Sequence, residues 1–429
     1  MCFLRLPGCP GREAPDLEGE AGRGKGALSL IRGNLLVLIA SWVLFNFASA
    51  LVFPYEALFM RELGASALII GLLSALGQAL LFVSRILGGY MADKYGRRDL
   101  IAWMTYGVAL SYLFYVFAPD WRLLLAGVVM HNLCLLYQPA LSAITADSMP
   151  PKRRGLGYAL VNVLPNVPAM FAPLLARALI EEFGFLRGMR LAYWIVVICG
   201  LLAADIRLLF LKETLKTGAR IRARDILPAF KRSIIEMRDA WSLMPRQLKV
   251  LTLVLLISSL EEPMFHLFLS LYAVDVVGIT EADWALMAVA WSLTTMLLGI
   301  PLGKAVDAMG RRRALIVAYA VWLPPTVYLL FCRSFVELLA VMVLFSVGGL
   351  LFVPAIQALQ ADLSPREARG RIMSLIGNLN LVAAAASSAV SGALYEMEPA
   401  LPFITALGLG LITFTIILLF LREPEVRYE

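Results

Sequence analysis

The sequence predicts an all-α membrane protein with twelve transmembrane helices in two pseudo-symmetric six-helix bundles. Of its 429 residues, 60% are hydrophobic and only 16% are charged, and the mean hydropathy is +0.78. A soluble protein carries about 25% charged residues. Apolar stretches long enough to cross a bilayer recur along the whole chain. Two loop motifs occur once in each half of the sequence, which indicates that one half is a duplicate of the other.

The duplication is carried by two motifs that keep their spacing. The first is GGYMADKYGRR at 88–98 and LGKAVDAMGRR at 302–312, which share a Gly, an Asp and a final Gly-Arg-Arg. The second is PALSAITAD at 139–147 and PAIQALQAD at 354–362, which share a Pro, three Ala and a final Asp. In both motifs, the second copy follows the first after nearly the same number of residues. Membrane transporters are commonly built from two such halves, with the substrate site between them.

The apolar stretches are predicted to be helices. Each approaches the roughly 20 residues that a helix needs to span the hydrocarbon core. A strand of a membrane barrel would be shorter and would alternate apolar with polar residues. The predicted spans are 34–60, 67–92, 100–118, 122–146, 156–179, 189–211, 249–274, 283–303, 314–332, 335–361, 370–395 and 401–421.

A polar segment at 212–248 divides the chain into predicted bundles at 34–211 and 249–421, with tails at 1–33 and 422–429. The first tail is rich in Gly, Pro and charge, so it is predicted to be disordered and to contain no cleavable signal peptide. Within the polar segment, apolar residues recur at roughly helical spacing between basic residues. This pattern predicts an amphipathic helix on the inner membrane face and is compatible with a plain tether. The recurring apolar residues are Ile226, Phe230, Ile234, Ile235 and Trp241.

The basic residues predict the orientation of the chain. Most of the 38 Lys and Arg residues fall in the loops and tails of one side. By the positive-inside rule, that side is cytoplasmic, together with both termini, and we expect a multi-pass protein of the plasma membrane. The net charge of +7 then reflects insertion and contact with anionic lipids, and it does not predict a nucleic-acid partner.

No constellation for enzyme catalysis, a cofactor or a metal is found. The segment GEAGRGK at 19–25 fits the first part of a phosphate loop, but Gly26 occupies the place of the required Ser or Thr. The chain has only two His, both inside spans, and its five Cys show no spacing typical of a disulfide or metal site. We therefore expect no enzymatic activity, no cofactor and no bound metal.

The repeated loops carry a resemblance to a known family. The motif Gly-x-x-x-Asp-x-x-Gly-Arg-Arg between spans 2 and 3 resembles the signature loop of the major facilitator superfamily, and its copy lies between spans 8 and 9. The elements from Asp147 to Arg154 and from Asp362 to Arg369 are similar to the family's loops between spans 4 and 5 and between spans 10 and 11. The resemblance covers about 34–421 and implies a twelve-helix fold with alternating access.

The repeated loops are predicted to form an inner gate. In each copy, one Gly is expected to allow close helix approach and a second Gly to permit a tight turn with positive φ. By resemblance, the Asp bonds the start of a helix of the opposite half, and the first Arg pairs with the Asp that ends span 4 or 10. These contacts would latch the inner side while the outer side is open, although the arginines alone also fit a role in setting topology. The close-approach residues are Gly89 and Gly303, the turn residues are Gly96 and Gly310, and the other gating residues are Asp93, Arg97, Asp147, Arg154, Asp307, Arg311, Asp362 and Arg369.

Span 7 contains two adjacent acids near the middle of the membrane. An ionisable group there costs on the order of 2.5–3.5 kcal/mol, so Glu261 and Glu262 are candidates for function. Glu262 and His266 share a helix face, and Pro263 weakens the helix between them. Adjacent carboxylates raise one another's proton affinity. One of them is therefore predicted to bind a proton or a cationic substrate, unless the pair only bonds neighbouring helices.

Other polar residues inside spans are candidates to contact the solute. The resemblance places spans 1, 4, 7 and 10 around a central cavity, which favours His131 and Glu262 as lining residues. Asp205 and Arg207 are expected at the inner rim. The remaining candidates are Glu56, Arg85, Tyr137, Asn162, Asn166 and Asn378.

These observations predict a secondary active transporter of a small solute that is proton-coupled and exports organic compounds. Gly127 stands where many proton-coupled members of the family carry an Arg, which weakens an assignment as a drug/proton antiporter. The alternatives are a nutrient or metabolite importer, acting as a symporter or uniporter, and a transporter-like sensor that moves nothing. The expected partners are a small molecule, protons and the lipid bilayer, and the protein is expected to be a monomer.

Overall fold

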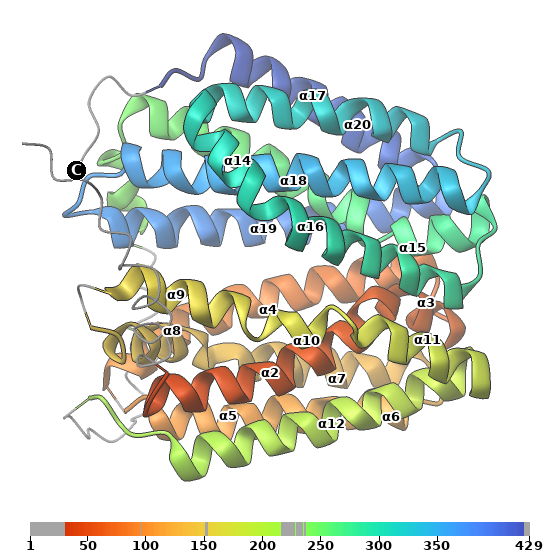
Figure 1. Cartoon of the computed structure of the whole chain (residues 1–429), viewed down its shortest axis with the longest axis horizontal. Helices are drawn as coiled ribbons and strands as arrows, with labels where there is room; N and C mark the ends of the chain where they lie inside the picture. Colours follow the sequence, from red (N-terminus) through yellow and green to blue (C-terminus); the bar gives the residue numbers. More distant parts are fainter. Residues whose placement is uncertain are drawn as a thin grey trace, which may run out of the picture.

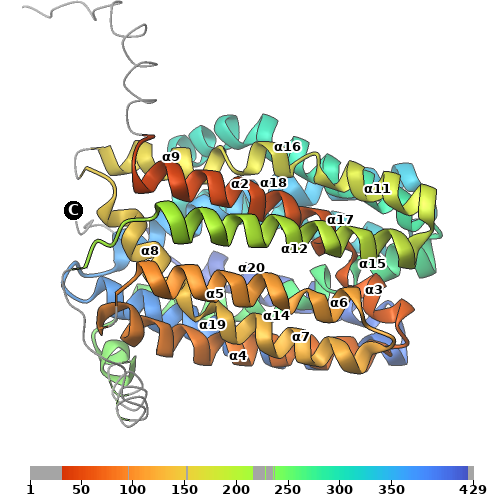
Figure 2. The ribbon, with the colours of Figure 1, turned by 90° about the horizontal axis from the view of Figure 1, so that it is seen from below.

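The computed structural model consists of two helical bundles, one from each half of the chain, that lie side by side with their helices roughly parallel (Figures 1 and 2). We call the end that carries Arg97 and Arg311 the inner end and the opposite end the outer end. All regular structure in the described part of the chain is helical. The structure describes residues 31–94, 96–150, 153–215, 228, 235 and 237–423.

The N-terminal half contains six spans, and four of them are built from consecutive shorter helices. The elements are α2 (Asn34–Val52), η1 (Phe53–Tyr55) and α3 (Glu56–Glu62) in span 1, α4 (Ala67–Lys94) in span 2, α5 (Arg98–Ser111) and α6 (Leu113–Val116) in span 3, α7 (Trp121–Cys134), η2 (Leu135–Tyr137) and α8 (Gln138–Asp147) in span 4, α9 (Arg154–Val163), α10 (Asn166–Ala169) and α11 (Ala172–Phe183) in span 5, and α12 (Phe185–Phe210) in span 6.

The C-terminal half repeats this plan with longer continuous helices. The elements are α14 (Arg246–His266), α15 (Leu269–Tyr272) and the π-helical turn η5 (Ala273–Val277) in span 7, followed by α16 (Glu281–Met309), α17 (Arg311–Leu329), α18 (Phe335–Leu363), α19 (Arg369–Met397) and α20 (Leu401–Leu419) in spans 8 to 12.

The prediction of twelve membrane helices is confirmed. Within the described ranges, 11 helices or helix runs are long and apolar enough to cross a membrane. The twelfth is α17, which is 19 residues long and packs against α18 and α20. Its average hydropathy is lower because it begins with three arginines, at 311–313, and contains Pro324 and Pro325.

Prolines lie at the interruptions of spans 1, 4 and 5, whereas span 3 is divided at Tyr112 without a proline. Pro54 lies in η1 and Pro139 at the start of α8. Pro165 and Pro168 lie where span 5 divides into α9, α10 and α11, a span that the sequence analysis drew as one helix. A proline has no N–H to donate and clashes with the preceding turn, so it ends or kinks a helix.

The two halves meet along α4 with α19 and along α11 with α16. Small residues permit the first contact. A Cβ atom added at Gly71 would lie 2.4 Å from the Ser388 carbonyl oxygen, and one added at Gly392 would lie 2.6 Å from the Ala67 carbonyl oxygen. The hydroxyl groups of Ser74 and Ser388 are 3.2 Å apart in the same contact. Close backbone approach of this kind is typical of helix packing in membranes.

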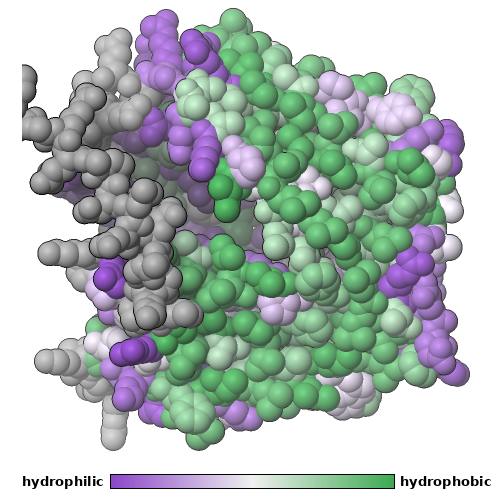
Figure 3. Space-filling model, in the orientation of Figure 1, coloured by the Kyte–Doolittle hydropathy of each residue, from purple (hydrophilic) through white to green (hydrophobic). Residues whose placement is uncertain are grey.

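The molecular surface has an apolar belt between two polar ends (Figure 3). Large apolar side chains are exposed along the belt, among them Leu209 at 70%, Leu297 at 68% and Ile300 at 72%. A lipid bilayer covers such a surface. Figure 3 also shows a hollow between the two halves near the inner end.

Most of the predicted amphipathic helix at 212–248 lies outside the described residues, as does the tail before residue 31. Residues 237–242 are helical. Ala240 and Met244 are buried against the C-terminal half, whereas Trp241 is exposed.

Candidate functional site

The predicted ion pairs of the repeated loops are present at the inner end. The Arg97 guanidinium contacts the Asp147 carboxylate in the N-terminal half, and Arg311 Nε lies 3.1 Å from Asp362 Oδ2 in the C-terminal half. Each pair joins the start of the third span of its half to the end of the fourth span of the same half. Each pair therefore stabilises one half and does not bridge the two halves.

The turn glycines behave as predicted, because Gly96 and Gly310 have φ values of 90° and 89°. The prediction for Gly89 and Gly303 is wrong for this structure, since a Cβ atom at either position would have no neighbour within 4 Å. The close approach occurs one residue earlier. A Cβ atom at Gly88 would lie 1.8 Å from the Leu136 carbonyl oxygen, at the break between α7 and α8.

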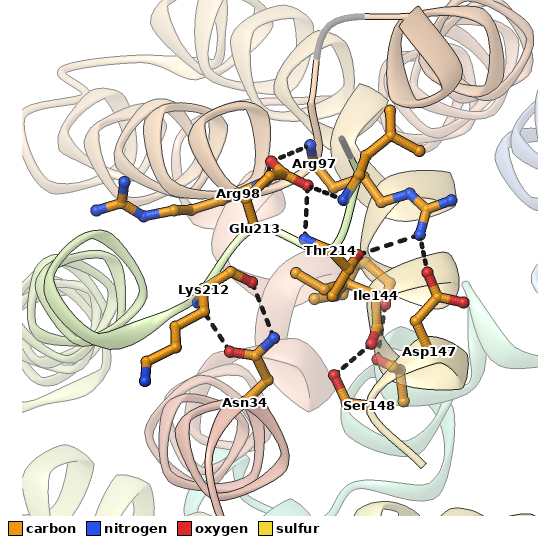
Figure 4. Close-up of polar contacts among 12 residues, drawn as sticks. Asn34, Arg97, Arg98, Ile144, Asp147, Ser148, Lys212, Glu213 and Thr214 are labelled. Atoms are coloured by element: carbon orange, nitrogen blue, oxygen red, sulfur yellow. Dashed lines mark hydrogen bonds and ion pairs between the residues drawn. The ribbon is translucent and has the colours of Figure 1, made fainter. Parts of the chain in front are cut away.

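An acid that was not among the predicted site residues completes the inner cluster of the N-terminal half (Figure 4). Glu213 follows α12, and its Oε2 atom accepts hydrogen bonds from the backbone N–H groups of Arg97 at 2.8 Å and Arg98 at 2.9 Å. Partial burial disfavours its ionised form, but four backbone N–H donors outweigh this and lower the pKa of Glu213. Nearby, Asn34 and Lys212 exchange two hydrogen bonds of 2.8 Å between side chain and backbone.

The C-terminal half contains the same arrangement. Glu423 Oε1 accepts the backbone N–H of Arg312 at 3.1 Å. The Arg312 guanidinium donates to the Leu418 carbonyl at 2.8 Å, as Arg98 does to Leu208 at 2.7 Å.

The sequence contains a signal for both acids. The segments LLFLKE at 208–213 and LLFLRE at 418–423 are a third repeated motif, and each ends with the acid that caps the start of the third span in its half.

The other predicted gating residues take no part in these two ion pairs. The side chain of Asp93 lies outside the described part of the structure. Asp307 is exposed, and no ion pair is described for it, so the predicted bond to the opposite half is not tested. Arg154 is exposed at the start of α9. Arg369 donates to the Ala361 carbonyl at 2.9 Å and so caps the end of α18.

At the outer end, polar contacts join the two halves directly. The Arg61 guanidinium of α3 contacts the Asp275 carboxylate of η5, which also accepts a hydrogen bond from the Tyr395 hydroxyl at 3.3 Å. Glu396 of α19 accepts the backbone N–H of Leu68 at 3.1 Å and so caps the start of α4 across the interface. None of these residues was singled out from the sequence.

A second pair of contacts closes the other side of the outer end. Arg177 Nη1 of α11 lies 3.3 Å from Asp283 Oδ1 of α16. The Trp284 indole donates to the Pro54 carbonyl at 2.8 Å. In these contacts, the N-terminal half supplies the cations and the C-terminal half supplies the acids. Whereas the ion pairs described at the inner end lie within one half, the Arg61–Asp275 and Arg177–Asp283 pairs at the outer end cross between the halves, so the outer end is closed.

The two adjacent acids of span 7 face different surroundings. Glu261 is 6% exposed and accepts hydrogen bonds from the Thr413 hydroxyl at 2.6 Å and the Tyr319 hydroxyl at 3.2 Å, inside the C-terminal bundle. Glu262 and His266 are exposed on another face of α14. The His266 ring packs edge-on against Trp291 of α16 at 5.7 Å. Glu262 and His266 share a face as predicted, while the side chain of Glu261 turns away from them.

Polar residues of the N-terminal half form a second group. The Tyr115 hydroxyl donates to Glu56 Oε1 at 3.4 Å. His131 lies 3.4 Å from the Ser111 hydroxyl and packs edge-on against Tyr112 at 5.2 Å. His131 therefore contacts span 3 within its own bundle, and the cavity role that the resemblance implies for it stays a prediction.

Two amides of span 5 connect to an amide that the sequence analysis missed. Asn46 Nδ2 donates to Asn166 Oδ1 at 3.1 Å, and Asn166 Nδ2 donates to the Asn162 carbonyl at 2.6 Å. By contrast, Asn378 is 5% exposed and its amide contacts the Met237 sulfur at 3.5 Å. Arg85 is exposed on α4, close to Gly377 of α19.

The expectation that Arg207 lies at the rim is wrong. Arg207 is 1% exposed and is enclosed by spans 1, 3 and 4. Its guanidinium donates to the hydroxyls of Ser41 at 3.0 Å and Thr105 at 2.8 Å and lies 5.7 Å from the centre of the Tyr137 ring. Its neighbour Asp205 is exposed, and its carboxylate accepts a hydrogen bond from the Tyr106 hydroxyl.

Comparison with known proteins identifies the family. A sequence model of the Major Facilitator Superfamily matches residues 35–279 and again 251–429. An uncharacterized MFS-type transporter of Methanocaldococcus jannaschii is 22% identical over 90% of this chain and 94% of its own length. The multidrug resistance protein MdtG of Salmonella typhimurium is 26% identical over 80% of this chain and 83% of its own length. The crystal structure of the human organic anion transporter MFSD10 superposes with a TM-score of 0.65 at 20% identity, covering 90% of this chain and 98% of that one. The chain belongs to the Major Facilitator Superfamily, and the predicted resemblance is confirmed.

Proposed function

We propose that this multi-pass membrane transporter is proton-coupled and exports organic compounds by alternating access. The observation that carries the proposal is the difference between the two ends of the molecule. Cross-half contacts such as Arg61 with Asp275 close the outer end, while the described ion pairs of the inner end stay within each half. This is the arrangement expected of a carrier that faces inward and must break the outer contacts to release a solute outside.

The solute is proposed to bind beside Glu262 and His266. Both side chains are exposed on α14, and aromatic rings of Phe265 and Trp291 adjoin His266. A carboxylate among aromatic rings suits an organic compound with an apolar body and a polar or cationic group. The similarity to multidrug resistance proteins supports export. Import of a nutrient or metabolite would use the same site in the opposite direction.

A transport assay with purified protein in liposomes tests the proposal. Counterflow of labelled sugars, organic acids, amino acids and lipophilic cations identifies the solute without a proton gradient. With that solute, we expect Glu262→Gln to abolish accumulation driven by a pH gradient while counterflow persists. Glu182→Gln, an exposed acid at the end of α11, is the matched control.

The coupling proposal fails if Glu261→Gln and Glu262→Gln both leave gradient-driven transport unchanged. Absence of counterflow for every solute class would favour a sensor. Placement in the plasma membrane as a monomer, with both termini in the cytoplasm, is part of the same proposal. Labelling of cysteines introduced into the tails of right-side-out vesicles tests the orientation.

A further inference from the structure

The two contacts between the halves extend to different depths. The contact of α4 with α19 reaches from Gly71 and Ser388 near the outer end down to Arg85, whose Nη1 atom would lie 4.0 Å from a Cβ atom at Gly377. On the other side, the extensive contact of span 5 with α16 is made by α11 alone, which is the outer part of that span. In Figure 1, α16 runs away from α9 toward the inner end. The halves are therefore separated between α9 and the inner part of α16.

The burial of α16 changes half-way along the helix. In residues 281–294, only Leu293 is exposed, whereas most of residues 295–309 are exposed. Met287 and Leu298 are eleven residues apart. Because eleven residues make about three helical turns, these two side chains lie on the same face of α16. Met287 is fully buried, but Leu298 is 37% exposed. The face that is covered in the outer half is therefore open in the inner half.

The two helices beside this opening expose apolar side chains. Leu156, Tyr158 and Val163 are exposed on α9, as is Leu298 on α16. At about 1.5 Å per residue, residues 295–309 extend over about 22 Å of a hydrocarbon core that is about 30 Å thick. The opening between α9 and α16 thus reaches from the inner end to the middle of the membrane. Figure 3 shows the hollow between the halves near the inner end.

The opening leads to the proposed solute site. Trp291 and Leu298 are seven residues apart, which is about two helical turns, so they also share a face of α16. The His266 ring packs edge-on against Trp291, and Glu262 is exposed on the same face of α14 as His266. The open part of α16 therefore ends at the aromatic ring that adjoins the site. A solute that arrived from water at the inner end would need no opening within the apolar belt.

We propose that the solute enters from the leaflet at the inner end, between α9 and α16, and that it is an amphiphile with a cationic group and an apolar body that partitions into the bilayer. This inference rests on the proposed function, since it names the class of solute and its route to the same site. Along this route, the apolar body passes from lipid chains to apolar side chains and is never transferred into water. At its end, the Glu262 carboxylate and the Trp291 ring attract the cationic group.

Quenching by brominated lipids tests whether lipid chains enter the opening, without any transport. A fluorophore is attached to Leu298→Cys or to Ile300→Cys in protein whose five native cysteines are replaced by alanine. Ile300 is exposed and lies two residues from Leu298, so it faces the opposite side of α16. In vesicles of phosphatidylcholine brominated on its acyl chains, we expect both labels to be quenched relative to unbrominated vesicles. Absence of quenching at Leu298→Cys, with quenching at Ile300→Cys as the control, overturns the proposal.

A bulky side chain in the opening tests the route. With the solute identified by counterflow, we expect Leu298→Trp to lower the initial rate of transport several-fold and Ile300→Trp to leave it unchanged. Equal rates in the two variants overturn the route. A solute that does not partition into protein-free vesicles overturns the proposed class, even where counterflow and gradient-driven accumulation support the proposed function. Failure of the proposed function is a different result, absence of counterflow for every solute class, and the quenching measurement does not depend on it.

Discussion

At the scale of single residues, the acids that follow the sixth and twelfth spans have the clearest structural role. Glu213 and Glu423 accept backbone N–H groups at the starts of α5 and α17, which have no partner within their own helices. An acid at this position also interacts favourably with the positive end of the helix dipole. Each half thus uses one carboxylate to connect its last helix to its third.

We expect Glu213→Ala to lower the free energy of unfolding by about 1 kcal/mol, the usual effect of losing a helix cap. Thermal unfolding in detergent measures this change, with Glu182→Ala as the exposed control. Burial raises the pKa of Glu213, but its hydrogen bonds lower it below the ordinary value of 4.5. Its contribution is therefore complete above about pH 5 and is lost as the pH falls through the lowered pKa. Equal stability differences at pH 7 and pH 3 would contradict this account.

The buried Arg207 gives a second residue-scale prediction. Ile417, which precedes LLFLRE as Arg207 precedes LLFLKE, is fully buried at the matching place. We expect Arg207→Ile to fold with little loss of stability, because Ser41 and Thr105 also donate to the carbonyls of their own helices.

The converse change leaves the guanidinium buried without its acceptors. Ser41→Ala together with Thr105→Ala should therefore cost about 1–3 kcal/mol. Thermal unfolding of the two proteins side by side decides the matter. The account is wrong if Arg207→Ile is the less stable protein.

At the scale of elements, the glycine that recurs in the repeated motif, Gly89, is not the residue at which α4 approaches span 4 most closely, which is Gly88. We expect Gly88→Ala to reduce the yield of folded protein severely, because a methyl group would overlap the Leu136 carbonyl. Gly89→Ala should be tolerated, since the space next to Gly89 is open. Size-exclusion chromatography of the two variants measures this contrast between neighbours. Similar profiles would mean that α4 and the break in span 4 are not in close contact.

The elements also show what the sequence can predict. The positions of the membrane spans could be predicted, because the thickness of the bilayer requires about 20 apolar residues in each spanning helix. The Arg97–Asp147 and Arg311–Asp362 pairs followed from a motif that occurs twice. The direction in which Glu261 turns did not follow, because it depends on the rotation of α14 against its neighbours. The cross-half contacts of Arg61 and Arg177 depend on which end is closed, and one sequence encodes both conformations.

At the scale of the whole molecule, the outer contacts define the conformational equilibrium. Arg61 and Asp275 are partly exposed, at 27% and 37% of their side chains, so their pair is worth about 1 kcal/mol or less. We expect Arg61→Asp and Asp275→Arg each to increase the outward-open population several-fold, because like charges then face each other. The double exchange should restore the wild-type distribution. Spin-label distances across the outer end measure all three proteins, and failure of the double exchange to restore closure would contradict the role of the pair.

The way in which charges are divided between the halves in the two cross-half ion pairs has a consequence for assembly. Two halves descended from one ancestor resemble each other enough to pair with their own kind. A bundle that presents Arg61 and Arg177 repels a copy of itself, as does one that presents Asp275 and Asp283. Only the mixed partnership is attractive, so the two segments, produced as separate polypeptides, carry the information to recombine in the correct combination.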